Sequence, residues 1–184
     1  MAVSRDPMLP LQTARLTLRL HRPQDMRPLL ALYSQPEVAR FLLEEPWSHA
    51  DAEVQIKQRL ERTDLFGPQE SLSLAIEFQG ALIGNTSIWL TDRDHHEAEI
   101  GWTLDPASGG QGLATEAVEA LLTLAFDHHR LHRIAAQLDA RNTASARLAE
   151  RVGMVREAHF RKNWWSKGEW TDTLIFAQLA DDRL

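Results

Sequence analysis

Hydrophobic and polar residues alternate with a period of two in several short segments, which is the pattern of half-buried β-strands. The clearest example is residues 15–20, Arg-Leu-Thr-Leu-Arg-Leu, and residues 71–78 follow the same rule. The pair Gln79-Gly80 joins residues 71–78 to a further apolar run, which predicts a β-hairpin. In chain order, the seven predicted strands are residues 15–20, 71–78, 82–89, 98–104, 133–138, 156–165 and 170–179.

Other segments have the three- and four-residue spacing of amphipathic helices. Ser48 and Asp51 form a capping box before one of them. Asn142 can cap another at its start, and Gly153 closes it. The predicted helices are residues 25–34, 38–42, 52–62, 118–129 and 143–151.

This order of elements predicts one α/β domain of the mixed α+β kind, in which antiparallel hairpins flank a central strand–loop–helix unit. A chain of 184 residues is long enough for one domain with a sizeable core. The expected domain covers residues 11–182, and residues 1–10 are expected to form a loose tail. No repeat divides the chain further.

Composition excludes several classes of function. The chain has no cysteine, so it has no disulfide, no thiolate metal site and no cysteine nucleophile. No signal peptide and no apolar run of membrane-spanning length are recognisable, so we expect a cytoplasmic protein without a membrane partner. The net charge of −6 argues against a nucleic-acid partner.

The chain is organised around residues 105–117, Asp-Pro-Ala-Ser-Gly-Gly-Gln-Gly-Leu-Ala-Thr-Glu-Ala, which join a predicted strand to a predicted helix. Glycines and a helix start together expose backbone N–H groups to an anion such as a diphosphate. The P-loop pattern fails because Leu113 and Ala114 follow the last glycine, and the dinucleotide pattern fails at Thr115. Taken alone, the loop leaves an acyl-CoA site and a loop without a ligand both open.

Four segments in order resemble the GNAT superfamily of acetyl-CoA-dependent N-acetyltransferases, and within it the RimJ/RimL type. The resemblance implies a single-domain fold with a mostly antiparallel, seven-stranded mixed sheet flanked by helices, and acetyl-CoA as co-substrate. The segments are residues 13–19, residues 98–104 with 109–117, residues 142–154, and the spacing of Arg161, Gly168 and Asp172.

The resemblance also implies where coenzyme A binds. Backbone N–H groups of residues 110–114 would hold the diphosphate, and the main chain of residues 102–104 would face the pantetheine. Gly109 departs from the Gln or Arg of the family pattern, which predicts less help from side chains. The implied cofactor-binding residues are Trp102, Thr103, Leu104, Gly109, Gly110, Gln111, Gly112, Leu113, Ala114, Thr115, Asn142, Ser145 and Arg151.

The resemblance suggests three catalytic candidates. Glu99 occupies the position of a general base, which must take a proton from the attacking ammonium group. Ala149 stands where many members have the tyrosine that protonates the thiolate, so Ser145 is the candidate donor instead. Asn142 would orient the acetyl group or pantetheine, although an asparagine at a helix start is also an ordinary N-cap.

Aromatic and acidic residues suit an acceptor that carries an ammonium group. The candidate substrate-binding residues are Trp47, Glu97, Trp164 and Trp170. The alternative for the tryptophans is that they are core and dimer contacts. His95 and His96 are adjacent in a predicted loop. His128 and His132 have the i, i+4 spacing of a metal site but lack the nearby Glu of the zincin pattern, so no metal is expected. The acceptor is an amine, with a protein N-terminus favoured, and the expected assembly is a monomer or a homodimer.

The predicted reaction is direct attack of the amine on acetyl-CoA in a ternary complex, since no activated nucleophile is evident. Three alternatives stay open. The first is acetylation of a small molecule such as an aminoglycoside or a polyamine. The second is an idle acyl-CoA-binding sensor, and the third is a nucleotide-binding oxidoreductase.

Overall fold

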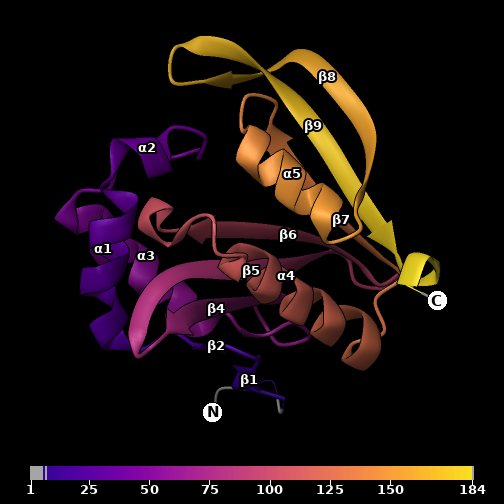
Figure 1. The fold of residues 1–184 in the computed structure, drawn as a ribbon, viewed down its shortest axis with the longest axis horizontal. Helices are drawn as coiled ribbons and strands as arrows, with labels where there is room; N and C mark the ends of the chain where they lie inside the picture. Colours follow the sequence, from indigo (N-terminus) through magenta and orange to yellow (C-terminus); the bar gives the residue numbers. More distant parts are fainter. Residues whose placement is uncertain (1–5, 7, 184) are drawn as a thin grey trace.

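The structure is a computed structural model that describes residues 6 and 8–183. Its centre is a mixed sheet with the strand order β1-β2-β4-β5-β6-β7-β9-β8, and β3 pairs with β4 outside this path (Figure 1). All neighbouring strands are antiparallel except β6 and β7. The strands are β1 (Leu11–Gln12), β2 (Leu16–Leu20), β3 (Thr63–Asp64), β4 (Ser71–Phe78), β5 (Ala81–Asp92), β6 (Glu97–Leu104), β7 (Arg133–Asp139), β8 (Val155–Ser166) and β9 (Glu169–Leu179).

The sheet therefore confirms the predicted mixed, mostly antiparallel fold, but it has nine strands within the described residues, and the prediction of seven was wrong. All seven predicted strands are present. The two additional strands, β1 and β3, are two residues long each. A segment of two residues cannot show a periodic pattern, so the sequence gives no signal for it.

The predicted hairpin between β4 and β5 forms as expected. Gln79 and Gly80 have φ values of +51° and +80°, which are the positive angles that a tight two-residue hairpin turn requires. Lys167 and Gly168 repeat this geometry between β8 and β9, with φ values of +49° and +83°. The tip of this second hairpin extends past α5 (Thr143–Arg151) toward α2 (Pro36–Ala39), where Lys167 Nζ donates to the carbonyl of Ala39 (Figure 1).

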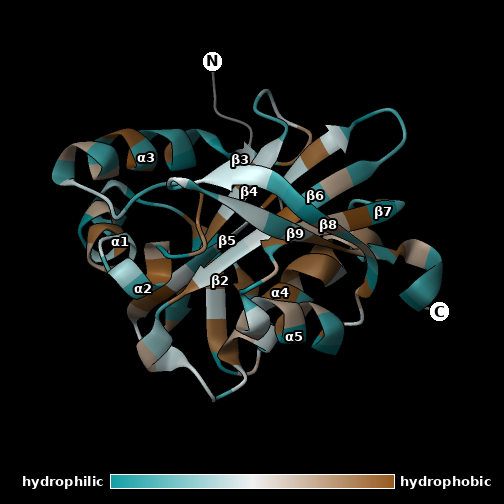
Figure 2. Cartoon of the chain, turned by 90° about the horizontal axis from the view of Figure 1, so that it is seen from above, coloured by the Kyte–Doolittle hydropathy of each residue, from teal (hydrophilic) through white to brown (hydrophobic). Residues whose placement is uncertain are grey.

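Helices cover both faces of the sheet. Figure 2 shows α3 on one side of the sheet and α4 and α5 on the other. The predicted helix at residues 118–129 begins earlier, at Leu113, and its last turn is a π-helix. The helices are η1 (Pro23–Asp25), α1 (Met26–Tyr33), α2, α3 (His49–Glu61), η2 (Pro106–Ser108), α4 (Leu113–Thr123), the π-helical η3 (Leu124–His128), α5 and η4 (Ala180–Arg183).

Two hydrophobic clusters hold these layers together. The large one fills the space between the sheet and α4 and α5, with Leu121, Ile134 and Phe176 fully buried in it. The small one joins α1 and α3 around Leu29 and Ile56. The two faces of the sheet are thus packed separately, which allows each face to carry its own site.

The predicted tail lies mostly outside the described residues, but Asp6 does not behave as part of a loose segment. Its side chain is buried, and its carboxylate lies 2.6 Å from Nε2 of His129. Its N–H also donates to the carbonyl of Thr63. Asp6 is therefore held against the body of the domain.

The candidate site lies where β6 and β7 separate. The parallel register covers only the first three residues of β6, Glu97, Ala98 and Glu99, opposite residues 133–135. Beyond Glu99, β6 continues to pair with β5, whereas β7 continues to pair with β9. The sheet consequently opens between the two strands, at the end of β6 that leads into the glycine loop.

Candidate active site

The main chain of β6 presents unpaired groups to this opening. In an antiparallel ladder, alternate residues direct their N–H and C=O groups to opposite sides of the strand. Asp105 N–H donates to the carbonyl of Ile83 on the β5 side, so residues 101, 103 and 105 face β5. The N–H and C=O of Trp102 therefore face the opening, as predicted for a strand that pairs with a ligand. Thr103 turns its main chain to β5 and contributes only its side chain to the cavity there.

The glycine loop lies directly beyond the opening. Within the described part of the chain, the amide N–H groups of residues 110–114 donate to no protein group. Gly110 and Gly112 have φ values of +74° and +76°, which favour glycine, and a Cβ on Gly110 would meet no atom within 4 Å. Five free donors thus lie together at the positive end of the α4 dipole, an arrangement that suits phosphate.

Arg15, which immediately precedes β2, braces the loop, a contact that no spacing along the chain predicts. Arg15 Nη1 donates to the carbonyl of Gln111 at 2.9 Å, and Arg15 Nε donates to Glu116 Oε2 at 2.7 Å. Burial acts to raise the pKa of Glu116, but hydrogen bonds from Thr13 and Arg15 outweigh it and lower the pKa. Arg15 therefore holds the loop and adds a positive charge beside it. Arg151 contacts the loop from α5, through Thr115 Oγ1 at 3.3 Å.

Glu99 stands where β6 and β7 separate. Its side chain lines the cavity, and Gln137 Nε2 on β7 donates to Glu99 Oε2 at 3.0 Å. Burial raises the pKa of Glu99 above its usual value, and the bond from Gln137 partly offsets this effect. A carboxylate with a raised pKa at a cavity wall is suited to accept a proton near neutral pH.

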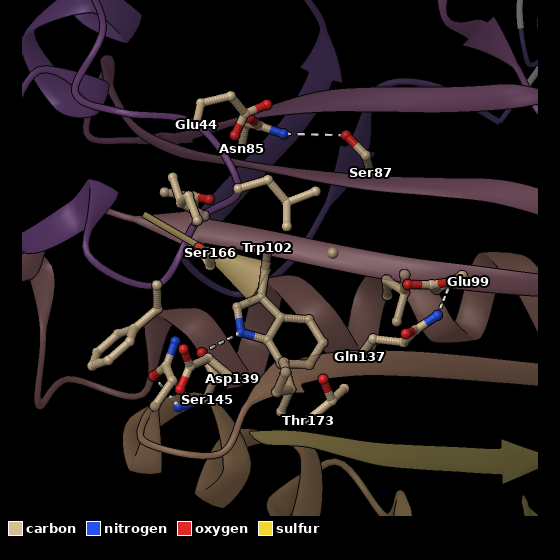
Figure 3. Close-up of a pocket in the computed structure, with 18 of the residues that line it drawn as sticks. Glu44, Asn85, Ser87, Glu99, Trp102, Gln137, Asp139, Ser145, Ser166 and Thr173 are labelled. Carbon is tan, nitrogen blue, oxygen red and sulfur yellow. Dashed lines mark hydrogen bonds between the residues drawn. The ribbon is translucent and has the colours of Figure 1, made fainter. Parts of the chain in front are cut away.

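Ser145 lies across the opening from Glu99, and the indole of Trp102 lies between them (Figure 3). Trp102 Nε1 donates to Ser145 Oγ at 3.2 Å. The Ser145 oxygen accepts this bond, and its own proton has no acceptor among the described residues, so it can be donated to a ligand. Asn142 Oδ1 accepts from the N–H of Ser145 at 3.1 Å, so Asn142 is the N-cap of α5 as well as a residue of the cavity wall.

The opening is part of a cavity of about 460 Å³ that reaches from Asn142 and Ser145 to side chains on the α3 side of the sheet. The end on the α3 side is formed by side chains that no sequence motif singles out. Tyr33, the chain's only tyrosine, is among them, and its hydroxyl donates to Asn85 Oδ1 at 2.6 Å. Further residues of this end are Arg59, Arg62, Ser87 and Trp89.

The structure brings only some of the predicted site residues together. Of the predicted substrate-binding residues, Trp164 lines the cavity. Trp47 is 6% exposed and stacks on the ring of Tyr33 at 4.1 Å, beneath the cavity wall. Glu97 lies at the opposite end of β6, in register with Arg133, and Trp170 is 56% exposed on the outer hairpin. Leu104 packs against the core and does not line the cavity.

The described part of the chain contains neither a cluster of metal ligands nor a helix of membrane-spanning character. No group of three or more histidine, aspartate or glutamate side chains there is arranged to hold a metal ion. None of the helices in that part combines the length and apolar character needed to cross a membrane.

The sequence of the chain was compared with protein families and curated proteins. Residues 15–155, more than half of the chain, match the family described as the acetyltransferase (GNAT) domain. The chain belongs to the GNAT family. It is 29% identical over 169 residues to the uncharacterized N-acetyltransferase p20 of Bacillus licheniformis. The aligned region covers 92% of this chain and 95% of that protein.

Solved structures of GNAT proteins have the same fold. A GNAT-family acetyltransferase from Bacillus anthracis superposes with a TM-score of 0.82 at 26% identity, over 93% of this chain and 98% of that one. Spermidine N-acetyltransferase from Vibrio cholerae, in complex with coenzyme A and spermine, gives 0.79 at 23% identity, over 92% and 98%. RimL, the ribosomal L7/L12 alpha-N-protein acetyltransferase, in complex with coenzyme A, gives 0.82 at 20% identity, over 94% and 98%.

This GNAT chain is an N-acetyltransferase that uses acetyl-CoA as its co-substrate. The residues present fit that molecule. Free amide groups at residues 110–114 match a diphosphate, and the unpaired main chain of Trp102 matches the amides of pantetheine.

Proposed function

We propose that this GNAT protein transfers the acetyl group to a primary amine by direct attack in a ternary complex, and that a peptide or protein N-terminus is the favoured acceptor. One observation carries the proposal. The opening between β6 and β7 places a half-buried carboxylate, Glu99, on one side and a free hydroxyl proton, Ser145, on the other, beside the glycine loop.

Each residue at the opening has a defined task in this proposal. Glu99 accepts the proton that the ammonium group of the acceptor must lose before its nitrogen can attack. The main-chain N–H of Trp102 faces the opening and is placed to donate to an oxygen that becomes negative during the reaction. Ser145 gives its proton to the leaving sulfur and takes in return the second proton that the attacking nitrogen loses as the amide forms, while the Trp102 indole holds the Ser145 oxygen in place. Acetyl-CoA supplies the activated acetyl group as a thioester.

The proposal needs no tyrosine in α5. Ala149 is fully buried there, where the family pattern often has a tyrosine, and Tyr33 donates its hydroxyl proton to Asn85 on the other side of the sheet. Ser145 is the hydroxyl that lines the cavity from α5. A hydroxyl is a weak acid, but a hydrogen bond from the indole N–H to its oxygen makes the hydroxyl a better donor.

The acceptor class distinguishes this proposal from its alternatives. RimL acts on a ribosomal protein and the spermidine enzyme acts on a polyamine, and both share this fold. The deciding measurement is release of free coenzyme A from acetyl-CoA in a screen over peptide N-termini, polyamines and aminoglycosides. We expect the fastest release with a peptide. Release with polyamines only would show a small-molecule enzyme, and tight acetyl-CoA binding without release would show a sensor domain.

A further inference from the structure

The inner end of the cavity holds a positively charged group that is almost completely buried. Arg59, on α3, is 8% exposed and lines the cavity. Its guanidinium donates to Gln55 Oε1 at 2.6 Å and lies 4.9 Å from the ring of Trp47 and 5.3 Å from that of Tyr33. Among the described residues, Arg59 has no carboxylate partner, and its Nε has no hydrogen-bond partner. Its other hydrogen bonds go to the Gln55 carbonyl at 3.3 Å and to Asn85 Oδ1 at 3.4 Å, so neutral acceptors and aromatic faces stabilise this charge only in part.

A second guanidinium lies at the same end. Arg62 lines the cavity three residues after Arg59, where α3 ends. Its side chain makes no hydrogen bond or ion pair with any described residue, and burial, together with the charge of Arg59, lowers its pKa. Two like charges in a partly buried place destabilise each other. Packing against Trp47 gives Arg59 a structural role, but nothing in the described structure compensates Arg62.

Carboxylates elsewhere in the cavity do not neutralise this pair. Glu99 is hydrogen-bonded to Gln137, and Asp139 is paired with Arg141 at 2.7 Å. Glu44 lies on the exposed rim. The inner end of the cavity thus presents two cations, which together suit an oxyanion. Ser87 donates its hydroxyl proton to Ser73, and Asn85 donates an amide proton to Ser87, so the two arginines are the principal donors there.

We infer that the acceptor carries a carboxylate or phosphate group besides its amine, and that Arg62, assisted by Arg59, binds this oxyanion. The inference rests on the proposed function, because it specifies the acceptor for the same site. The phosphates of coenzyme A do not fill this place: their loop precedes α4, whereas Arg59 projects from α3 on the opposite face of the sheet (Figure 2). A polyamine would bring additional positive charges against the arginine pair and is disfavoured.

Matched acceptors and variants test the inference by steady-state kinetics. One arm compares peptides with Asp or Glu against Asn or Gln at the second and third positions. The other arm compares aminoalkyl carboxylates and phosphates with the corresponding amino alcohols, which distinguishes a peptide source of the oxyanion from a small molecule. In Arg62→Gln, we expect KM to rise about tenfold for acceptors with the oxyanion and to stay unchanged for those without it, with kcat nearly constant.

Two further variants serve as controls. Arg62→Lys keeps the charge and should recover part of the affinity. Arg156→Gln removes the same charge from an exposed position on β8, outside the cavity, and should change nothing. An unchanged KM in Arg62→Gln, or a lower KM for spermidine than for every acceptor with an oxyanion, would overturn the inference.

A binding measurement separates this inference from the proposed reaction. We would titrate the protein, saturated with coenzyme A, with inorganic phosphate and with succinate, and follow the arginine Nε–H resonances by NMR. We expect one resonance to shift in the wild type and to be missing in Arg62→Gln. A shifted resonance without turnover of any amine would support the oxyanion site and contradict the proposed reaction. Turnover of amines, with no shifted resonance at millimolar phosphate or succinate, would support the proposed reaction and contradict the oxyanion site.

Discussion

The two halves of this site are built in different ways. The loop proposed for the cofactor is a contiguous segment, residues 109–115, which offers backbone N–H groups at one helix start. The cavity proposed for the acceptor takes its walls from α1, residues 41–44, α3, β5, β6, β7, α5 and the β8–β9 hairpin, and its character depends on side chains. A local backbone site can be recognised in a sequence, whereas a cavity assembled from distant side chains can diverge in each family member without changing the fold.

The halves also differ in how they present positive charge. The loop offers neutral amide donors, with Arg15 and Arg151 at its exposed margin. The cavity offers the buried Arg59 and the adjacent Arg62. Exposed charges are screened by solvent and contribute little, while buried charges interact strongly with whatever enters. Substitutions in the two halves should therefore separate binding of acetyl-CoA from binding and turnover of the acceptor.

The largest effect is expected from Gly112→Asp, which breaks the loop and leaves the cavity intact. A side chain at φ +76° costs about 1–2 kcal/mol. The new carboxylate would also face the phosphates of coenzyme A. We expect the affinity for acetyl-CoA, measured by calorimetry, to fall at least about 100-fold.

Gly80→Asp is the matched control for that variant. Gly80 has a φ of +80° in the β4–β5 turn, and a Cβ there would meet no atom within 4 Å. It carries the same backbone penalty far from the loop. Equal loss of affinity in both variants would mean that the effect is general destabilisation and that the loop does not hold the cofactor.

The next effect is that of Glu99→Gln, which should leave acetyl-CoA affinity unchanged and lower kcat about 100-fold. Because burial raises the pKa of Glu99, the basic form accumulates only as the pH rises through that raised value. The wild-type rate should therefore increase with pH over this range, and the variant should lack this limb of the pH–rate profile.

Two further variants test whether the pH dependence comes from Glu99. Gln137→Leu removes the hydrogen bond that lowers the pKa of Glu99, so the limb should move to higher pH. Glu119→Gln, on the exposed surface of α4, should have a wild-type profile. A profile in Glu99→Gln that keeps the limb would show that another group takes the proton.

A smaller effect is expected from Ser145→Ala, at the boundary between the two halves. Loss of a proton donor to the sulfur should lower kcat about tenfold, with nearly unchanged affinity for acetyl-CoA. Trp102→Phe keeps a ring but removes the bond to Ser145 Oγ, and should lower kcat by less. Unchanged turnover of Ser145→Ala at saturating substrates would remove Ser145 from the mechanism.

The smallest effect is that of Arg15→Gln, which loosens the loop from outside. Its pairing with Glu116 is exposed, so we expect acetyl-CoA affinity to fall only about three- to fivefold, which corresponds to ~1 kcal/mol. Combining it with Glu116→Gln should add less than the single effects predict, because the two side chains act as one brace. If the losses of acetyl-CoA affinity were fully additive, Arg15 would act directly on the ligand and not through its pairing with Glu116.

Several elements could be predicted because their signal is local. Alternation over residues 15–20 and 71–78 and the Gln79-Gly80 turn led to strands and a hairpin that the structure contains. Asn142 caps α5 as expected. The two-residue strands have no periodic signal. The sequence leaves Trp47 open between the acceptor site and the core, and its 6% exposure and its stacking on Tyr33 assign it to the core beneath the cavity wall.

The sequence by itself determined the order of strands and helices, the family, and the glycine loop, because each depends on residues close together in the chain. Only the tertiary structure decided where β6 leaves β7, that Arg15 braces the loop, and that Tyr33, Arg59, Arg62 and Asn85 meet in one cavity. Such contacts join residues up to about a hundred positions apart. They arise from the packing of whole elements, and no spacing along the chain encodes them.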